Sequence, residues 1–280
     1  MNYKNEFERS RIEYLLSRNE IIKVMDGLHV YEGIVNLNSR KVGMYKFIKK
    51  LLPSFDILYQ VSSLNSIASV LTLNRMIIDH YAVFYLLTSF STEQERNLRY
   101  YLYLIDGIKT RSNVLRDFIS KVSTNTYDKA YQNINSVLQI DSKSISDLQT
   151  YINTNNVDSY ITERIIQQNN WKFVDRSSYK KVRDNSYSWI QLYKLARIPE
   201  KYSNAFQKHY SSYVHGLGIT LMNNSEEDHL PLVCSALSLT AIILSLIIKI
   251  LLEEYSDKLN NVNLNPNFTT YMNHNWENWH

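Results

Sequence analysis

A run of 19 residues without a charge, from Leu230 to Ile248, constrains the fold of this chain more than any other feature. A transmembrane helix needs about 20 apolar residues, so the run is close to that length. Two arrangements remove such a surface from water. The run is either a membrane span or the central helix of a bundle, covered by other helices on all sides.

The residues within and around the run favour the central helix. A stripe of small side chains lets another helix approach closely; it consists of Ser235, Ser238, Ala241 and Ser245. Asp228 and Pro231 are typical of a helix N-cap and a first turn. The pattern then continues beyond the run to Tyr255. We predict a long central helix over 230–258 and no stable membrane insertion, with a membrane span as the alternative.

The chain has 280 residues but only 6 Gly and 4 Pro. Sheets need Gly-rich turns, so this scarcity favours long helices joined by few connections. The pattern predicts a single all-α domain over 1–280, a helical bundle with its core in 42–120 and 185–258 and a tail over 260–280. Helices are expected at 5–26, 42–61, 63–90, from Ser91 onward with Gln94 in a capping box, and at 186–196, 200–215 and 230–258. The polar residues 127–169 predict an insertion of two or three short helices.

Charge and cysteine content describe the expected environment. The formal net charge is +4 and the pI is near 8.8, which is mildly basic and weaker than in a dedicated nucleic-acid binder. Cys234 is the sole cysteine, so no internal disulfide can form. The N-terminal residues are charged and amphipathic, without a signal-peptide pattern. We expect a cytoplasmic protein.

Three ionisable residues interrupt the apolar stretch 71–87, "LTLNRMIIDHYAVFYLL". Arg75 and Asp79 are four residues apart, so on a helix they lie on one face and can pair. Small neighbours on that face would let another helix approach. His80 is about 140° away from Arg75 on an ideal helix, on an apolar face. The pair is interpreted as either a structural ion pair or part of a catalytic site, and His80 as either a core histidine or a catalytic one.

A second candidate cluster lies in 206–218, "FQKHYSSYVHGLG". Gly216 suits a helix C′ position, which places His215 at a helix C-terminus where its protonated form is stabilised. Ser211 is one turn earlier, but no G-x-S-x-G motif supports a serine hydrolase. His215 facing Arg75 and Asp79 across the bundle would form an Arg/Asp/His cluster. This geometry favours His215 over His80 as the histidine on which activity depends.

The segment 171–185 is basic, and common motifs for metals and cofactors do not occur in the sequence. Lys180 and Lys181 lie in that segment, which is either a solvated connection or a loop that contacts phosphates. The acidic residues 226–229 match the positive end of a helix. The sequence holds no H-E-x-x-H, cysteine cluster, P-loop or G-x-G-x-x-G. We expect no metal site and no cofactor.

Two stretches resemble an uncharacterised bacterial family of helical proteins that is associated with phage defence. They are "NRMIIDHYAVFYLLTSFSTEQERNLRYYLYLIDGIKTR" and "YSNAFQKHYSSYVHGLG". The family has an Arg-x-x-x-Glu/Asp helix, an acidic-then-Arg helix start and a late Ser-x-x-x-His-Gly/Pro element. The resemblance covers about 45–120 and 185–255. The matching positions are Arg75, Asp79, Arg99, Ser211 and His215.

A looser resemblance is to the HEPN superfamily of helical, dimeric, metal-independent ribonucleases. Its mark is an arginine followed by four to six residues and a histidine, and Arg75 and His80 have this spacing. The resemblance implies that the arginine stabilises the scissile phosphate and that the histidine assists attack by the RNA 2′-hydroxyl, across a dimer interface. Met76 departs from the pattern, because a polar residue usually follows the arginine.

Two functional hypotheses follow. The first is a HEPN-like defence or stress effector that binds and cleaves RNA without a metal, as a homodimer. Its candidate catalytic residues are Arg75, Asp79, His215 and His80, and its candidate substrate-binding residues are Arg99, Ser211, Tyr210, Lys180 and Lys181. The second is a non-catalytic helical sensor or protein-interaction module of a defence system, in which the charged cluster only fixes helix packing.

Overall fold

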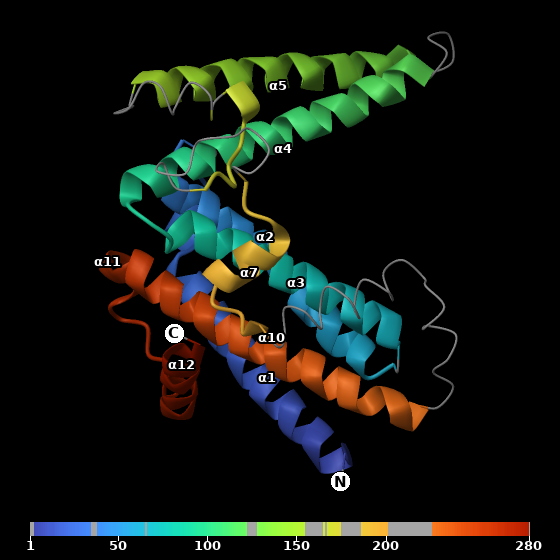
Figure 1. Cartoon of the computed structure of the whole chain (residues 1–280), viewed down its shortest axis with the longest axis vertical. Coiled ribbons are helices and arrows are strands. Elements are labelled where there is room, and N and C mark those ends of the chain that lie inside the picture. Colours follow the sequence, from blue (N-terminus) through green and yellow to red (C-terminus); the bar gives the residue numbers. More distant parts are fainter. Residues whose placement is uncertain are drawn as a thin grey trace. The chain divides into compact units, whose positions relative to one another are not determined.

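The computed structural model describes residues 3–34, 38–64, 66–121, 128–154, 165, 167–174, 186–200 and 226–279. These residues belong to two compact units, one formed by 1–90 with 188–280 and the other by 91–187. Across the described ranges the secondary structure is helical, apart from an isolated bridge between Phe173 and Ser186. The predicted all-α bundle is confirmed (Figure 1).

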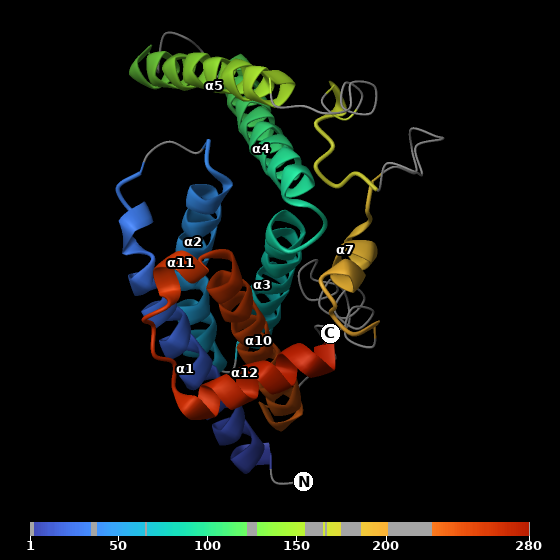
Figure 2. The same ribbon diagram turned by 90° about the vertical axis from the view of Figure 1, so that its left-hand side faces the viewer.

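The first unit is built around one long apolar helix, α10 (Glu226–Glu254). The helices α1 (Tyr3–Gly27), α2 (Arg40–Ser62), α3 (Ile67–Thr88), α11 (Ser256–Leu259) and α12 (Pro266–Trp279) all pack against it. Figure 2 shows α12 running across α10 rather than along it. The short elements η1 (His29–Tyr31) and α7 (Trp189–Leu195) complete the unit.

Within the described residues, α10 is long and apolar enough to cross a membrane, but 72% of its apolar window is buried by the rest of the chain. Its central position confirms the predicted central helix, and the absence of membrane insertion stays a prediction. The start differs from the prediction, because the helix already begins at Glu226. Asp228 therefore lies inside the helix, and Pro231 lies one turn further in than predicted.

Polar side chains fix how three neighbouring helices lie against α10. Ser238 donates to Ser10 of α1 (2.9 Å), and Ser245 accepts from the Asn275 amide of α12 (3.1 Å). On the α3 side, the Asn74 amide donates to the Thr240 hydroxyl (2.7 Å). Sliding any of these helices along α10 would leave a buried polar group without its partner, so these contacts define the register of the bundle.

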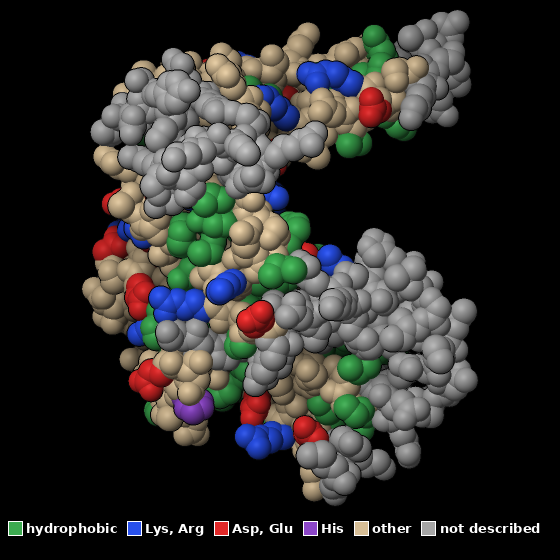
Figure 3. All heavy atoms as spheres, in the orientation of Figure 1, with side chains coloured by type: hydrophobic (Ala, Val, Ile, Leu, Met, Phe, Trp, Pro, Cys, Tyr) green, Lys and Arg blue, Asp and Glu red, His purple; other side chains and the backbone are tan. Residues whose placement is uncertain are grey.

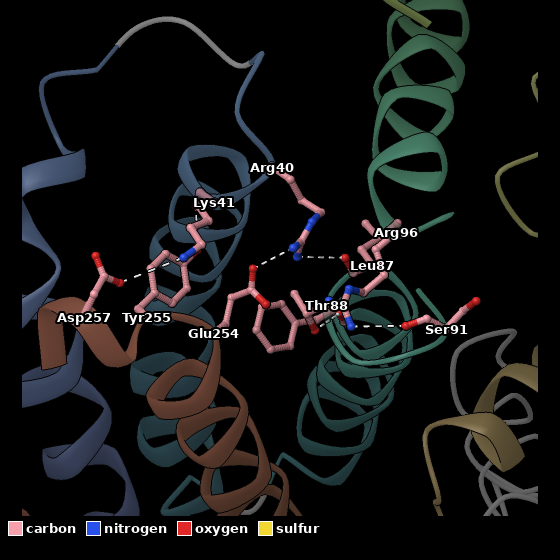
Figure 4. A network of polar contacts seen from close by, with 10 residues as sticks. Arg40, Lys41, Leu87, Thr88, Ser91, Arg96, Glu254, Tyr255 and Asp257 are labelled. Atoms are coloured by element: carbon pink, nitrogen blue, oxygen red, sulfur yellow. Dashed lines mark hydrogen bonds and ion pairs between the residues drawn. The ribbon is translucent and has the colours of Figure 1, made fainter. Parts of the chain in front are cut away.

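A buried ion pair joins the ends of three helices. Arg40 begins α2 and Glu254 ends α10, so each charge lies at the end of its helix where the dipole disfavours it. The Arg40 Nη2 donates to the Glu254 Oε1 (2.6 Å), and its Nη1 donates to the carbonyl of Leu87 (3.3 Å), in the last turn of α3. Figure 4 shows the guanidinium between these two acceptors. The pair neutralises both misplaced charges and satisfies a helix-end carbonyl.

The second unit is a helical hairpin with a short segment packed on it. It pairs α4 (Glu93–Lys121) with α5 (Asp128–Thr154). The Asp141 carboxylate is buried in the seam, where it accepts hydrogen bonds from Ser112 (2.9 Å) and Arg111.

Two local predictions for the second unit were wrong. Residues 128–154 form one helix rather than several short ones, because apolar residues recur every three or four positions within the polar sequence. The capping residue of α4 is Thr92, whose hydroxyl accepts from the Glu95 N–H (3.4 Å), rather than Ser91. Ser91 has a positive φ of 70°, and its hydroxyl bonds to the Glu95 carboxylate.

We predict that Arg40→Ala lowers the free energy of unfolding by about 3–5 kcal/mol, because it leaves the Glu254 carboxylate without its partner at a mostly buried position. Urea unfolding followed by circular dichroism measures the change. Lys249→Ala is the control, since it removes a cation that pairs with Glu253 at the surface of the same helix. The control should cost less than about 1 kcal/mol. Equal effects of the two substitutions would contradict the prediction.

Candidate functional site

The predicted Arg75–Asp79 pair forms on α3. Arg75 Nε lies 3.9 Å from Asp79 Oδ2, and the two side chains are 24% and 27% exposed. The separation is long for a hydrogen-bonded pair, so the attraction between these two groups is mainly coulombic. Both groups are partly accessible to solvent, which a fully buried structural pair would not be.

The residue that completes the cluster is Tyr193, which comes from α7 in the same unit. Its hydroxyl donates a hydrogen bond to the Asp79 Oδ1. Ser188 and Gln191 form a capping box that begins α7, and Tyr81 of α3 donates to the carbonyl of Ala196 (3.2 Å) at its end. The sequence predicted that a helix could approach Arg75 and Asp79 closely, and α7 is that helix.

The environment of Asp79 favours its protonated form. Burial raises the pKa of the Asp79 carboxyl, and the hydrogen bond from Tyr193 and the charges of Arg75 and His80 offset only part of this rise. Burial and the hydrogen bond to Asp79 also raise the pKa of Tyr193, so its phenol remains protonated and acts as the donor. The cluster therefore combines a guanidinium, a carboxyl that takes up a proton readily and a fixed phenol.

His80 follows Asp79 directly but faces another part of the unit. Its Nδ1 lies 2.7 Å from the carbonyl of Met76, and its ring lies 5.5 Å from the ring of Phe47 on α2. A carbonyl can only accept, so Nδ1 carries a hydrogen, and Nε2 is the other ring nitrogen. His80 is half-buried, with this hydrogen bond as a local anchor.

Arg99 lies in the second unit and is fully buried. Its Nε and Nη2 donate to Glu95 (3.1 and 2.5 Å), and its Nη1 donates to the carbonyl of Trp171 (3.0 Å). The guanidinium carbon lies 3.7 Å from the centre of the Phe173 ring. These contacts hold the segment around Trp171 against α4. A substrate-binding role for Arg99 stays a prediction.

The other candidate residues lie outside the described residues; they are Lys180, Lys181, Tyr210, Ser211 and His215. The proposed contact of His215 with Arg75 and Asp79 therefore stays a prediction. Sequence reasoning missed Tyr193. The capping box at Ser188 could have located its helix, but no local pattern connects Tyr193 with Asp79, which is 114 residues away.

Among the described residues, no three His, Cys, Asp or Glu side chains gather as a metal site. Comparisons with known proteins gave no match, whether to family models, to curated proteins or to solved structures. The two family resemblances stay predictions.

We predict that Asp79 makes the protein relatively more stable as the pH falls from neutral towards 4. Its pKa is raised in the folded state, so the folded protein takes up this proton before the unfolded chain does. The unfavourable contribution of the charged carboxylate is present at neutral pH and disappears as the pH falls through the folded pKa. The Asp79→Asn variant should lack this pH-dependent contribution to the free energy of unfolding.

The measurement compares urea midpoints of the wild type and the variant between pH 7 and pH 4. The matched control is Glu253→Gln, which removes a carboxylate from the surface of the same unit. The control should follow the wild-type profile. An Asp79→Asn profile parallel to that of the wild type would show that Asp79 is not the titrating group.

We also predict that Tyr193→Phe lowers the free energy of unfolding by about 1–3 kcal/mol, because it removes a donor to a partly buried carboxylate. In a protein that already carries Asp79→Asn, loss of the Tyr193 hydroxyl should lower the free energy of unfolding by less, since the asparagine has no charge to solvate. A double-mutant cycle measures this coupling. Independent effects of the two substitutions would argue against the contact.

Proposed function

We propose that this chain is a HEPN-like defence or stress effector that acts on RNA, cleaving it without a metal ion. The observation that carries the proposal is the partly exposed pair of Arg75 and Asp79, held by the buried Tyr193, with His80 next to Asp79 on the same helix. A guanidinium can stabilise the negative charge that develops on a phosphate during transfer, and a histidine can exchange protons near neutral pH.

The proposed reaction needs one proton acceptor and one proton donor. The acceptor removes the proton from the 2′-hydroxyl, whose oxygen forms a bond to the adjacent phosphorus. The bond from phosphorus to the 5′-oxygen breaks, and that oxygen takes up a proton as it leaves. The products are a 2′,3′-cyclic phosphate and a 5′-hydroxyl. Arg75 would neutralise charge on the phosphate oxygens, and Asp79 with Tyr193 would orient Arg75.

The partner histidine of Arg75 distinguishes two forms of the site. His80 is about 140° from Arg75 around the helix, so one copy of α3 directs the two groups to different sides. In the HEPN-like form a homodimer brings His80 of one copy to Arg75 of the other. In the second form His215 completes the cluster within one chain.

On the face of the first unit drawn in Figure 3, charge of both signs is mixed rather than uniformly basic. Lys and Arg side chains are interspersed there with Asp and Glu (Figure 3). A broad basic surface would give strong binding to any nucleic acid and a steep dependence on salt. A local cluster such as Arg75 would instead act on one phosphate.

A second candidate function is a non-catalytic helical sensor or protein-interaction module. The hydrogen bond between Tyr193 and Asp79 favours it, because this contact joins α7 to α3 and gives the cluster a structural role. In that case the charged residues fix helix packing and do not touch a substrate.

The experiment incubates the purified full-length protein with labelled single-stranded RNA in the presence of EDTA. We expect products that end in a 2′,3′-cyclic phosphate, and Arg75→Ala should slow their formation by at least about 100-fold while the protein stays folded. Arg9→Ala is the control, because Arg9 is 80% exposed on α1. It should leave the rate unchanged.

Two histidine variants then separate the two forms of the site. Loss of cleavage in His215→Ala, with His80→Leu still active, would support the cluster within one chain. Loss in His80→Leu alone would support the dimeric form. Intact RNA with the wild-type protein would contradict the proposal and favour the sensor.

A further inference from the structure

A second group of aromatic and charged side chains lies between α1 and α2, on residues that the Arg75 cluster does not use. They border a hollow of about 300 Å³, which we call the α1–α2 groove; its lining residues are Tyr14, Leu15, Arg18, Asp56, Tyr59 and Gln60. Pockets for small molecules typically hold about 300–1,000 Å³, so the groove is large enough for a small ligand.

One wall of the groove is a fixed aromatic surface. The rings of Tyr14 and Tyr59 are nearly parallel, with centres 5.9 Å apart and an angle of 14° between planes. The Tyr14 hydroxyl donates to the carbonyl of Phe55 (2.6 Å). The Tyr59 hydroxyl accepts from the Arg11 Nη2 (2.7 Å), and the Arg11 guanidinium carbon lies 5.0 Å from the centre of the Tyr59 ring. Tyr14 is fully buried, so Tyr59 is the ring of this pair that a ligand can reach. Because Tyr59 is already held in place, another planar ring can stack on it at little entropic cost.

Three of the other lining residues, Arg18, Asp56 and Gln60, supply hydrogen-bond donors and acceptors. Arg18 Nε donates to Asp56 Oδ1 (2.8 Å), and these side chains are 33% and 46% exposed. Among the described residues, the two Nη groups of Arg18 and the side-chain amide of Gln60 make no hydrogen bond. The groove thus offers guanidinium donors to an anion and a carboxylate acceptor to N–H groups.

We propose that the α1–α2 groove binds one nucleotide, with the base stacked on Tyr59, its N–H edge at Asp56 and its phosphate at Arg18. A simple anion would not use the aromatic wall, and an uncharged aromatic compound would not use Arg18. A nucleotide combines a planar ring, N–H donors and an anion in one molecule. The same chemistry is present in a free mononucleotide and in an unpaired residue of single-stranded RNA.

Isothermal titration of the full-length protein with guanosine 5′-monophosphate tests the proposal. This probe is suitable because guanine presents adjacent N–H donors to a carboxylate. We expect binding of one molecule per chain. Ribose 5-phosphate, which lacks the base, should bind at least about tenfold more weakly, since stacking of a base on an aromatic side chain contributes substantially to affinity.

Variants assign the binding to the groove. Arg18→Gln should weaken binding of the nucleotide about tenfold, whereas Arg9→Gln, on the same helix and paired with Glu13, should not change it. Tyr59→Leu should weaken binding by a similar factor. Tyr59→Phe keeps the ring and should bind the nucleotide within about twofold of the wild type. Comparison of Tyr59→Leu with Tyr59→Phe therefore separates loss of stacking from loss of the fold.

A single-stranded hexaribonucleotide containing one guanosine distinguishes the sources of the ligand. Tighter binding than that of the mononucleotide identifies an RNA residue, and weaker binding identifies a free nucleotide. No binding of the mononucleotide at millimolar concentration overturns the proposal. Equal binding of ribose 5-phosphate, or equal weakening by Arg9→Gln and Arg18→Gln, also overturns it. The inference does not rest on RNA cleavage, because a protein that cleaves no RNA would still show this binding.

Discussion

The apolar surface of α10 must be kept from water, and the architecture of the first unit follows from this constraint. A helix that is apolar on every side cannot lie at the edge of a bundle, so neighbours are needed around it. The helices α1, α2, α3, α11 and α12 supply them. Hydrophobic packing alone would let these helices slide, because it has no direction. The hydrogen bonds of Ser10, Asn74 and Asn275 to α10 provide the direction that packing lacks.

In both units, charged residues are stabilised by tertiary contacts. Arg40 and Glu254 each lie at the unfavourable end of a helix, and each is stabilised by the other. Arg99 is buried without access to solvent, and Glu95, the Trp171 carbonyl and the Phe173 ring surround its guanidinium. The Arg75 cluster differs from these sites, since Arg75 and Asp79 are partly exposed and the ion pair between them is long. Among these three arginine sites, it is therefore the one whose guanidinium side chain is most accessible to solvent.

Features with a local periodicity could be predicted from the sequence, and features created by long-range contacts could not. The helices around Arg75 and Leu237 follow from apolar spacing, and the Arg75–Asp79 pair follows from the four-residue repeat of a helix. The contact of Tyr193 with Asp79 depends on tertiary packing, so no sequence window contains it. The single helix over 128–154 was missed because its polar composition masks the spacing of its apolar residues.

The order in which the chain is made affects how this bundle can assemble. Asn74 and its partner Ala236 are 162 residues apart, and the whole second unit lies between them in sequence. Ribosomes add about 5–20 residues per second, so α3 waits roughly 8–30 s for the helix that covers it. During that interval the apolar face of α3 has only the helices made before it as cover. Folding of the first unit is therefore completed late in synthesis, and chaperones that hold exposed apolar helices have a defined time window in which to act.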